Sequence, residues 1–330
     1  MKKIKIAQIG TSKNSHGTMI WNSLVKQSDI FEVVGYAMPE NEKEKFYDQV
    51  KPFLDYPELS LDEILQNPEI EAVAVETEEK YLTKYALMCA EHKKHIHMEK
   101  PGGIELCDFE KLIALVKENK TVFHTGYMYR YNPAIIDTFE KIERGELGDI
   151  ISVEAQMSCP EPAAVRQWLS DYPGGMMFFL GCHLVDLILR IKGEPEKITS
   201  FNASTGFEGI SSKDYGMAVF EYDSGASFVK TNAWEPGGFG RRQLVVTGTR
   251  ASIEIKPLEW CAPGGKQYTE LHEIKGANWH EKAEVMHSAP VDRYDPMTYG
   301  FAERVRGKEE KIYTPDYELT LYKTLLKCCK

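Results

Sequence analysis

Five short apolar runs alternate with helical patterns through the first 128 residues, and this alternation constrains the fold more than any other feature. The first run, IKIAQIG, covers residues 4–10 and ends in glycine. The other runs cover residues 31–38, 71–77, 95–99 and 121–128, with helical patterns at 17–27, 61–66, 80–92 and 105–119. Strands that alternate with helices favour a parallel sheet with right-handed crossovers. The sequence therefore predicts a doubly wound α/β domain of the Rossmann type, a fold that binds nucleotides.

The pattern changes after about residue 128. Strand-like segments follow one another without intervening helices, which indicates a mostly antiparallel sheet. They cover residues 148–158, 214–224, 225–235, 241–248 and 251–257, with hairpin turns at 223–225 and 247–250. One long apolar helix is expected at 174–193, and a final helix closes the chain. We therefore predict a Rossmann domain at 1–126, on which the last helix is a candidate to pack, and an α+β domain at 127–330.

Composition and charge exclude several classes of function. A chain of 330 residues that is 42% hydrophobic and 27% charged suits two globular domains. Its net charge of −10, without a block of Lys and Arg, argues against nucleic-acid or anionic membrane partners. No apolar run approaches the roughly 20 residues of a membrane span, and the N-terminus lacks the long apolar region of a signal peptide. The seven cysteines form no CxxC pair and read as reduced thiols, so we expect a cytoplasmic protein.

The first predicted strand is followed by the loop GTSKNSHG, residues 10–17, where a Rossmann domain holds a phosphate. The spacing is GxxxxxxG and not GxGxxG. Gly10 allows a sharp turn, and the polar side chains are candidates to donate to a pyrophosphate at the start of the next helix: Thr11, Ser12, Asn14, Ser15 and His16. The alternative is a helix start that is capped and binds nothing.

The second predicted strand ends at Met38, where an acid that binds the ribose hydroxyls is expected. Glu40 and Glu42 follow shortly and are candidates to replace it. No Arg lies close enough in sequence to indicate a pocket for a 2′-phosphate. This pattern favours NAD over NADP.

Two further groups of residues carry possible chemistry. Glu99, Lys100 and Pro101 follow the fourth strand and precede two glycines; the plain alternative is a strand closed by Pro and a turn. His183 and Asp186 are three residues apart on the long apolar helix and share one face. They are either a hydrogen-bonded pair in the core or a site that handles protons.

Four motifs in order resemble the Gfo/Idh/MocA oxidoreductases, the family of glucose–fructose oxidoreductase and inositol dehydrogenase. They are EKPGG at 99–103, GYMYRYNPA at 126–134, GELGDIISVEAQ at 145–156 and GGMMFFLGCHLVD at 174–186. The resemblance implies a Rossmann domain followed by a domain with a large open sheet that packs against another subunit, and hence a homodimer or homotetramer. It also implies an NAD(P)-dependent dehydrogenase that acts on a hydroxyl of a sugar, polyol or cyclitol.

The resemblance assigns roles to individual residues. Lys100 would stabilise the developing alkoxide, His183 would take the hydroxyl proton, and Asp186 would bind a neighbouring hydroxyl or orient His183. These three residues and Tyr127 would contact the substrate. Trp168 resembles a family Trp near the nicotinamide; the alternative is a packing residue. The predicted cofactor contacts are Gly10, Thr11, Ser12, Asn14, Ser15, His16, Met38, Thr77, Glu99, Lys100, Pro101, Tyr127, Arg130 and Trp168.

The sequence departs from the family pattern in two places. Phe179 stands where the family often has an Asp four residues before the catalytic His. Glu76, Glu78 and Glu79 replace small, Pro and Asn residues after the third strand, and three acids would repel a pyrophosphate.

These departures keep two alternatives open. One is a redox-neutral relative that retains its NAD and eliminates a glycosidic bond. The other is a non-oxidoreductase, such as a nucleotide or sugar sensor or an enzyme that has replaced nicotinamide with a metal. His272, His280 and His287 fit no common metal signature, so we predict no metal site.

Overall fold

The computed structural model describes residues 2–261, 267–276 and 282–330, and it divides into two compact units. The first unit comprises residues 1–128 and 294–322, and the second comprises residues 129–293 and 323–330. Each unit is built around one large sheet.

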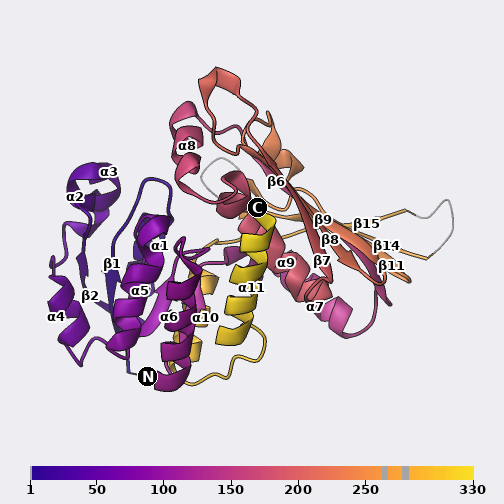
Figure 1. The fold of residues 1–330 in the computed structure, drawn as a ribbon. Helices are drawn as coiled ribbons and strands as arrows, with labels where there is room; N and C mark the ends of the chain where they lie inside the picture. The colour runs from indigo at the N-terminus through magenta and orange to yellow at the C-terminus, as the bar shows by residue number, and fades with distance from the viewer. Residues whose placement is uncertain (1, 262–266, 277–281) are drawn as a thin grey trace. The chain divides into compact units, whose positions relative to one another are not determined.

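The first unit contains a parallel sheet of five strands in the order β2-β1-β3-β4-β5, which confirms the predicted fold class (Figure 1). The strands are β1 (Ile4–Ile9), β2 (Phe31–Ala37), β3 (Ala72–Val75), β4 (His95–Met98) and β5 (Phe123–Thr125). All four residues of β3 are buried, as expected for a strand that is covered on both faces. The strand order reverses between β1 and β3, and ligands of such sheets bind beyond the carboxyl ends of the strands at this reversal.

Helices follow the strands of the first unit much as the periodicity predicts. The longer ones are α1 (Gly17–Lys26), α5 (Leu82–Glu91), α6 (Leu106–Asn119), α10 (Asp295–Val305) and α11 (Pro315–Cys328), whose last residues belong to the second unit. The shorter ones are α2 (Glu42–Lys45), α3 (Tyr47–Val50) and α4 (Leu61–Gln66), which Ser60 and Glu63 begin with a capping box. Helices α5 and α6 lie side by side along the sheet (Figure 1).

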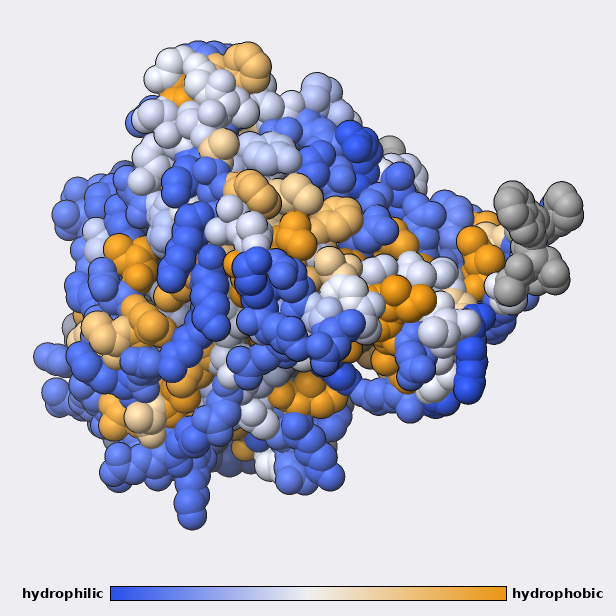
Figure 2. Space-filling view, turned by 45° about the vertical axis from the view of Figure 1, so that its right-hand side comes forward, coloured by the Kyte–Doolittle hydropathy of each residue, from blue (hydrophilic) through white to orange (hydrophobic). Residues whose placement is uncertain are grey.

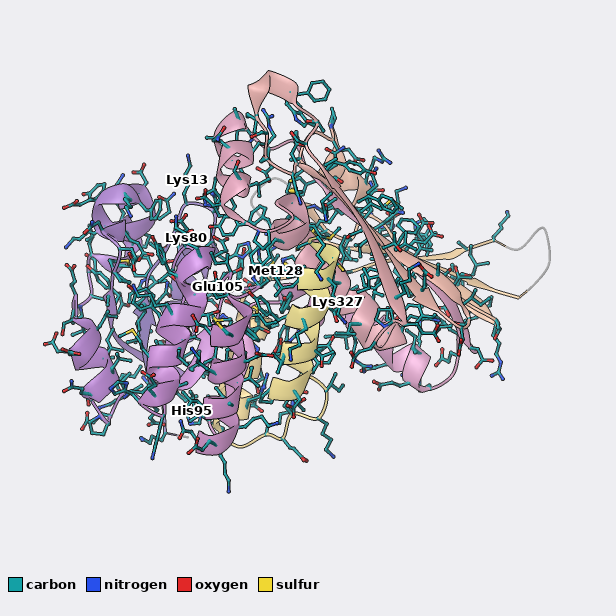
Figure 3. The ribbon with its side chains drawn as sticks, viewed as in Figure 1. Lys13, Lys80, His95, Glu105, Met128 and Lys327 are labelled. Atoms are coloured by element: carbon teal, nitrogen blue, oxygen red, sulfur yellow. The ribbon has the colours of Figure 1, made fainter. Side chains whose placement is uncertain are left out.

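The carboxyl ends of the five strands share one edge of the first unit. Figure 3 shows Lys13 of the first loop, Lys80 after β3 and Met128 after β5 toward this edge, while His95 at the start of β4 lies at the opposite end. The loops that the sequence singles out as cofactor contacts in this unit therefore emerge on one side of the sheet.

The second unit contains an eight-stranded sheet in the order β15-β14-β11-β10-β6-β9-β8-β7. Its strands are β6 (Ile150–Ser158), β7 (Lys197–Ala203), β8 (Tyr215–Tyr222), β9 (Gly225–Asn232), β10 (Gln243–Gly248), β11 (Ala251–Ile255), β14 (Glu270–Lys275) and β15 (Glu284–His287). Neighbouring strands are antiparallel except for β6 and β9, which are parallel. The mostly antiparallel sheet is confirmed, and β7, β14 and β15 extend it beyond the predicted strands.

The two faces of this sheet differ. A row of directly opposed residues on one face is buried: Ala218, Val229, Ala155, Leu244, Ile255 and Leu271. Helix α9 (Cys182–Lys192) packs against β6 and β9. The corresponding row on the other face, which we call the open face, is half-exposed and mixes apolar with polar residues: Thr199, Val219, Phe228, Glu154 and Val245.

The prediction of one continuous helix over 174–193 is wrong. Gly174 and Gly175 both have positive φ and form a turn, a π-helical segment covers Met177–Gly181, and the regular helix α9 begins only at Cys182. A Cβ on Gly181 would lie 2.5 Å from the Met177 sulfur, so a larger residue at this position would require the Met177 side chain to shift.

The surface in view in Figure 2 is mostly hydrophilic, with apolar residues distributed among the polar ones. Among the described residues, no helix is both long enough and apolar enough to cross a membrane.

Candidate functional site

The loop after β1 is tightly packed against the segment that follows β3. Gly10 has φ +82°, and a Cβ on it would lie 2.3 Å from the Thr77 side chain and 2.8 Å from its Cα. A Cβ on Gly17, at the start of α1, would lie 2.7 Å from the Thr11 hydroxyl. Two of the glycine roles of a dinucleotide loop, the sharp turn and the close approach of helix to strand, are therefore present despite the unusual spacing.

Hydrogen bonds within the loop fix its shape. The backbone N–H of Ser12 donates to Ser15 Oγ and that of Ser15 donates to Ser12 Oγ, both at 3.0 Å. Ser15 Oγ also accepts from the Gly17 N–H at 3.3 Å, so this side chain helps to cap α1. Gln8 is buried under the loop and donates to the carbonyls of Gly10 and Gly17. Ser12 and Ser15 thus hold the loop in one conformation at the positive end of α1.

Glu40 and Glu42, the two candidates for the missing ribose acid, have different environments. Glu40 accepts hydrogen bonds from Lys84 and Tyr85, and these bonds lower its pKa. Glu42 is buried and accepts from the Thr11 N–H at 3.4 Å. Burial raises the pKa of Glu42 to about 8. Glu40 is therefore the acid that stays charged, while Glu42 accepts the hydrogen bond of the Thr11 N–H, which is then not free for a ligand.

The acids after β3 differ from the expectation of three repelling charges. Glu76 and Glu79 are fully buried, and burial raises the pKa of both, for Glu79 to about 8. Glu79 is therefore mainly neutral near pH 7, and burial disfavours the charged form of Glu76 as well. Only Glu78, which pairs with Lys80 at 3.1 Å, remains as a partly exposed acid. The repulsion of a pyrophosphate is correspondingly weaker than the sequence predicts.

The EKP segment directly follows β4 and is buried. Lys100 is 1% exposed, and its Nζ lies 3.8 Å from the Glu99 carboxylate. His16 Nδ1 lies 3.3 Å from both oxygens of that carboxylate, so the loop after β1 and the EKP segment meet at Glu99. Burial alone would raise the pKa of Glu99, but His16 and Lys100 outweigh it and lower this pKa.

The two glycines after Pro101 anchor the segment. Gly102 has φ +123°, and a Cβ on it would lie 3.0 Å from the Phe109 ring. The Gly103 N–H donates to Thr83 Oγ1 at 2.7 Å, and the Gly103 carbonyl accepts from the Tyr322 hydroxyl. Helices α5, α6 and α11 therefore all contribute to the position of Lys100.

A pair of histidines that the sequence did not single out together lies under this segment. His97 and His124 are register partners on β4 and β5, and their Nδ1 atoms are 2.7 Å apart. His97 packs against Phe301 of α10, with ring centroids 5.8 Å apart. Burial lowers the pKa of His97 to about 4, so its ring is neutral, and its Nε2 lies 3.4 Å from Glu76.

In the second unit, His183 and Asp186 are both buried on α9. Asp186 accepts two hydrogen bonds from the Arg130 guanidinium, at 2.9 and 2.8 Å, in a bidentate pair. The structure therefore brings together Arg130, which we expected at the cofactor, and Asp186, which we expected at the substrate.

Tyr129 connects His183 to a second charged cluster. Its ring lies edge-on to the imidazole, with centroids 5.0 Å apart, and its hydroxyl donates to Glu259 at 2.5 Å. Burial raises the pKa of Tyr129. Arg242 and Arg293 also bind Glu259. Burial alone would raise the pKa of Glu259, but the two arginines outweigh it and lower this pKa. Sequence analysis missed this cluster because its members are distant in the chain.

The remaining predicted residues lie in several environments. Trp168 packs against Tyr172 and edge-on against Phe179, with centroids 4.6 and 5.2 Å apart. Met38 packs against the apolar cluster of Trp21, Tyr36 and Phe53. Thr77 and Tyr127 are buried, Pro101 follows Lys100 in the buried EKP segment, and Asn14 is half-buried in the first loop.

The histidines of the second unit do not form a metal centre in the part of the chain that the structure describes. His272 and His287 both contact Glu270, at 2.6 and 3.3 Å, and His280 lies outside the described residues. No group of three or more His, Cys, Asp or Glu residues in the described ranges is arranged to hold a metal ion.

Two family models match the chain. The model described as "Oxidoreductase family, NAD-binding Rossmann fold" matches residues 4–127, and the one described as "GFO/IDH/MocA C-terminal domain" matches residues 138–254.

Individual relatives are more distant. A scyllo-inositol 2-dehydrogenase (NAD(+)) of Bacillus subtilis is 28% identical over 66% of this chain and 62% of its own length. A 2,7-anhydro-N-acetylneuraminate hydratase of Escherichia coli is 23% identical over 61% of this chain and 55% of its own length. The chain thus spans less than two thirds of either enzyme.

A crystal structure of a putative NADPH-dependent oxidoreductase from Desulfitobacterium hafniense has the same fold. It superposes with a TM-score of 0.83 at 19% identity, over 99% of this chain and 94% of that protein.

Proposed function

Since this chain belongs to the Gfo/Idh/MocA oxidoreductase family, we propose that it is an NAD(P)-dependent dehydrogenase. Its reaction transfers a hydride between the nicotinamide and a hydroxyl-bearing carbon of a sugar, polyol or cyclitol. The named inositol dehydrogenase among its relatives supports this class of substrate.

The observation that carries the proposal is the burial of Lys100. An ammonium group loses its hydration when it is buried, so a lysine that is 1% exposed at the end of a strand needs a specific purpose. The Glu99 carboxylate lies 3.8 Å from the Lys100 Nζ and also contacts His16. A cation held in this way stabilises the negative charge that develops on a substrate oxygen as its carbon loses hydride.

The residues of the first unit fit a dinucleotide. Gly10 and Gly17 allow the tight packing of the loop, and Thr11, Ser12 and Ser15 lie in it just before the N-terminus of α1. Glu40 is the charged acid after β2. Thr11 Oγ1 is buried without a hydrogen-bond partner among the described residues, as expected for a group that faces a ligand. When bound, the nicotinamide supplies the hydride acceptor or donor.

His183 is our choice for the group that accepts the hydroxyl proton, because a neutral imidazole is an effective base near pH 7. We assign Asp186 and Tyr129 to positioning. Arg130 fixes Asp186, which lies on the same helix as His183. Tyr129 packs edge-on against the His183 imidazole, and its bond to Glu259 holds it there.

The test is a hydride-transfer screen. The purified chain is first assayed for bound nucleotide and then incubated with NAD⁺ or NADP⁺ and with myo-inositol, scyllo-inositol, D-glucose or sorbitol, with absorbance followed at 340 nm. We expect turnover with at least one pair. Lys100→Met should reduce kcat/KM by about 10²–10³-fold, whereas Lys111→Met, which alters an exposed lysine on α6, should leave it unchanged. Equal activity of both variants would refute the role of Lys100.

The hydratase among the relatives supports a second candidate, a redox-neutral reaction that retains its cofactor. Phe179, which packs on Trp168, agrees with it because no acid occupies this position on the turn before His183. Cofactor that co-purifies and shows no net reduction with any polyol, together with elimination from a glycoside, would favour this candidate.

A further inference from the structure

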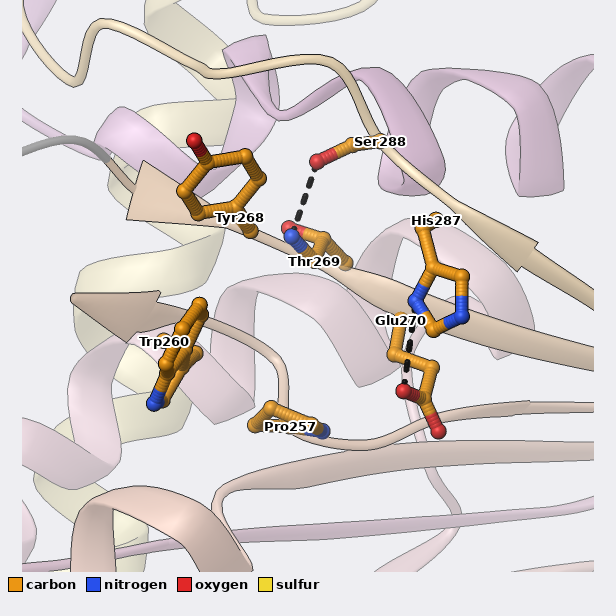
Figure 4. A pocket seen from close by; sticks show the side chains of 7 residues that line it. All are labelled: Pro257, Trp260, Tyr268, Thr269, Glu270, His287 and Ser288. Atoms are coloured by element: carbon orange, nitrogen blue, oxygen red, sulfur yellow. Dashed lines mark hydrogen bonds and ion pairs between the residues drawn. The ribbon is translucent and has the colours of Figure 1, made fainter. Parts of the chain in front are cut away.

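A pocket of about 500 Å³ in the second unit is built by residues that the dehydrogenase proposal does not use. It is lined from β12 (Trp260–Cys261), β13 (Gln267–Tyr268), β14 and β15 (Figure 4). This volume lies within the range of about 300–1,000 Å³ that small-molecule sites occupy.

The two sides of the pocket differ in chemistry. Trp260 and Tyr268 are paired across β12 and β13 with ring centroids 5.6 Å apart, and Pro257 adds an apolar floor. Glu270 and His287 lie across from the indole in Figure 4, joined by a contact of 3.3 Å. A ligand here meets flat aromatic carbon on one side and hydrogen-bonding groups on the other.

The residues that line this pocket differ from those around His183. Glu259 is buried and binds Tyr129, the neighbour of His183, whereas the next residue, Trp260, is 51% exposed and lines the pocket. The described lining includes neither His183 nor Tyr129 nor Glu259, so we treat the pocket as a site of its own.

The walls of the pocket are held by bonds that a ligand does not need to replace. The Thr269 N–H donates to Ser288 Oγ at 2.8 Å, and the Ser288 N–H donates to the Thr269 carbonyl at 2.9 Å. His272 Nε2 lies 2.6 Å from Glu270 Oε1, and this contact helps to fix the carboxylate. A half-exposed indole beside a fixed carboxylate is a preorganised surface, and this reduces the entropy lost on binding.

The lining selects a class of ligand. None of the described lining residues is Lys or Arg, and Glu270 is acidic, so phosphates and other anions are disfavoured. A pyranose ring has an apolar face of C–H groups and an edge of hydroxyls, which matches an aromatic side opposite a carboxylate and an imidazole. We propose that this pocket binds a neutral carbohydrate ring, stacked on Trp260 with its hydroxyls toward Glu270 and His287, independently of the reaction proposed above.

The experiment is saturation-transfer NMR and calorimetric titration of the full chain, freed of nucleotide, with D-glucose, D-galactose, N-acetyl-D-glucosamine and cellobiose. We expect at least one sugar to bind with its ring C–H groups in contact. Trp260→Ala and Glu270→Gln should each weaken binding at least tenfold. Tyr47→Ala, which removes an exposed aromatic from the first unit, should not.

Three results would overturn the proposal. Two are the absence of binding of all four sugars and sugar binding that is unchanged in Trp260→Ala. The third is binding of tetramethylammonium in place of sugars, since aromatic rings also bind such cations. Glu270→Gln preserves the shape of the side chain, so a loss of binding in a folded Gln variant supports the site even if the Ala variant is unstable. Because no cofactor is present, failure of the hydride-transfer screen would leave this result intact, and the two proposals can fail separately.

Discussion

The Glu79 carboxyl is 1% exposed beside the buried Glu76 and Glu99, in a segment that sequence analysis placed next to the cofactor. Burial raises its pKa to about 8, compared with about 4.3 in an unfolded chain. Between these two values the folded state binds one more proton than the unfolded state. This contribution to stability is therefore full below about pH 4.3 and is lost as the pH rises to about 8.

Glu79→Gln removes this titration. The free energy of unfolding of the variant minus that of the parent chain should rise with pH, by about 1 kcal/mol per pH unit between pH 5.5 and 7.5. Urea unfolding at several pH values measures this difference. Glu91→Gln, at an exposed position near the end of α5, provides the control and should show a flat difference. A flat difference for Glu79→Gln as well would mean that the carboxyl is charged in the folded state.

At the scale of single elements, the Arg130–Asp186 pair joins the turn at Met128–Tyr131 to helix α9. Both side chains are almost completely buried, so removal of one leaves an uncompensated charge in the core. Asp186→Leu should reduce the free energy of unfolding by about 3–5 kcal/mol.

The double variant Arg130→Met/Asp186→Leu is the matched test of this pair. It replaces both charges by apolar groups, so it should be more stable than the Asp186→Leu single variant despite carrying one more substitution. Urea unfolding of the parent, both single variants and the double variant completes the cycle. Additive losses would show that the pair has no coupling energy.

The elements that sequence reasoning predicted are those with a strong local signal. All five parallel strands are apolar runs that end near polar or glycine residues, and the hairpins at 223–225 and 247–250 carry turn sequences. Strand β7 was missed because each of its seven residues is at least partly exposed, so that it shows no alternation of buried and exposed positions. The break at Met177–Gly181 was missed because it lies within an evenly apolar run that carries no local signal of a wide turn.

The candidate site divides in the same way. Lys100, His183 and the Gly10 loop were identified from local motifs, and the structure shows them buried or tightly packed. The pairing of Tyr129 with Glu259 spans 130 positions of sequence, and neither residue belongs to a pattern that indicates the other. Likewise, the burial that raises the pKa of Glu76 and Glu79 depends on tertiary packing, which one sequence does not reveal.

At the scale of the whole molecule, the open face of the second unit bears on assembly. Phe201, which is 56% exposed, pairs on this face with Met217, beside the row of Thr199, Val219 and Phe228. We propose that this face packs against a second copy, since a broad half-apolar face is rarely left in water.

Light scattering after gel filtration tests this assembly. We expect a mass of two or four times 37.6 kDa for the parent chain. Phe201→Glu should shift the protein toward the monomer, while Tyr47→Glu, at an exposed aromatic in the first unit, should not. A monomeric parent chain at micromolar concentration would contradict the proposed interface.

The central claim is that the loop between β1 and α1 still holds a nicotinamide dinucleotide. Calorimetric titration of nucleotide-free protein with NAD⁺, NADH, NADP⁺ and NADPH tests it most directly, with Gly10→Ala as the test variant and Gly145→Ala as its match. Gly10 and Gly145 both have positive φ, so alanine strains the backbone at either position. Only at Gly10 would a Cβ also meet other atoms within 4 Å. An effect seen in Gly10→Ala alone is therefore due to the packing of the loop. We predict that the nucleotide binds to the parent chain and to Gly145→Ala, and that binding is lost in Gly10→Ala. Absence of binding of all four nucleotides to the parent chain, in a preparation that carried none, would contradict the claim and with it the dehydrogenase proposal.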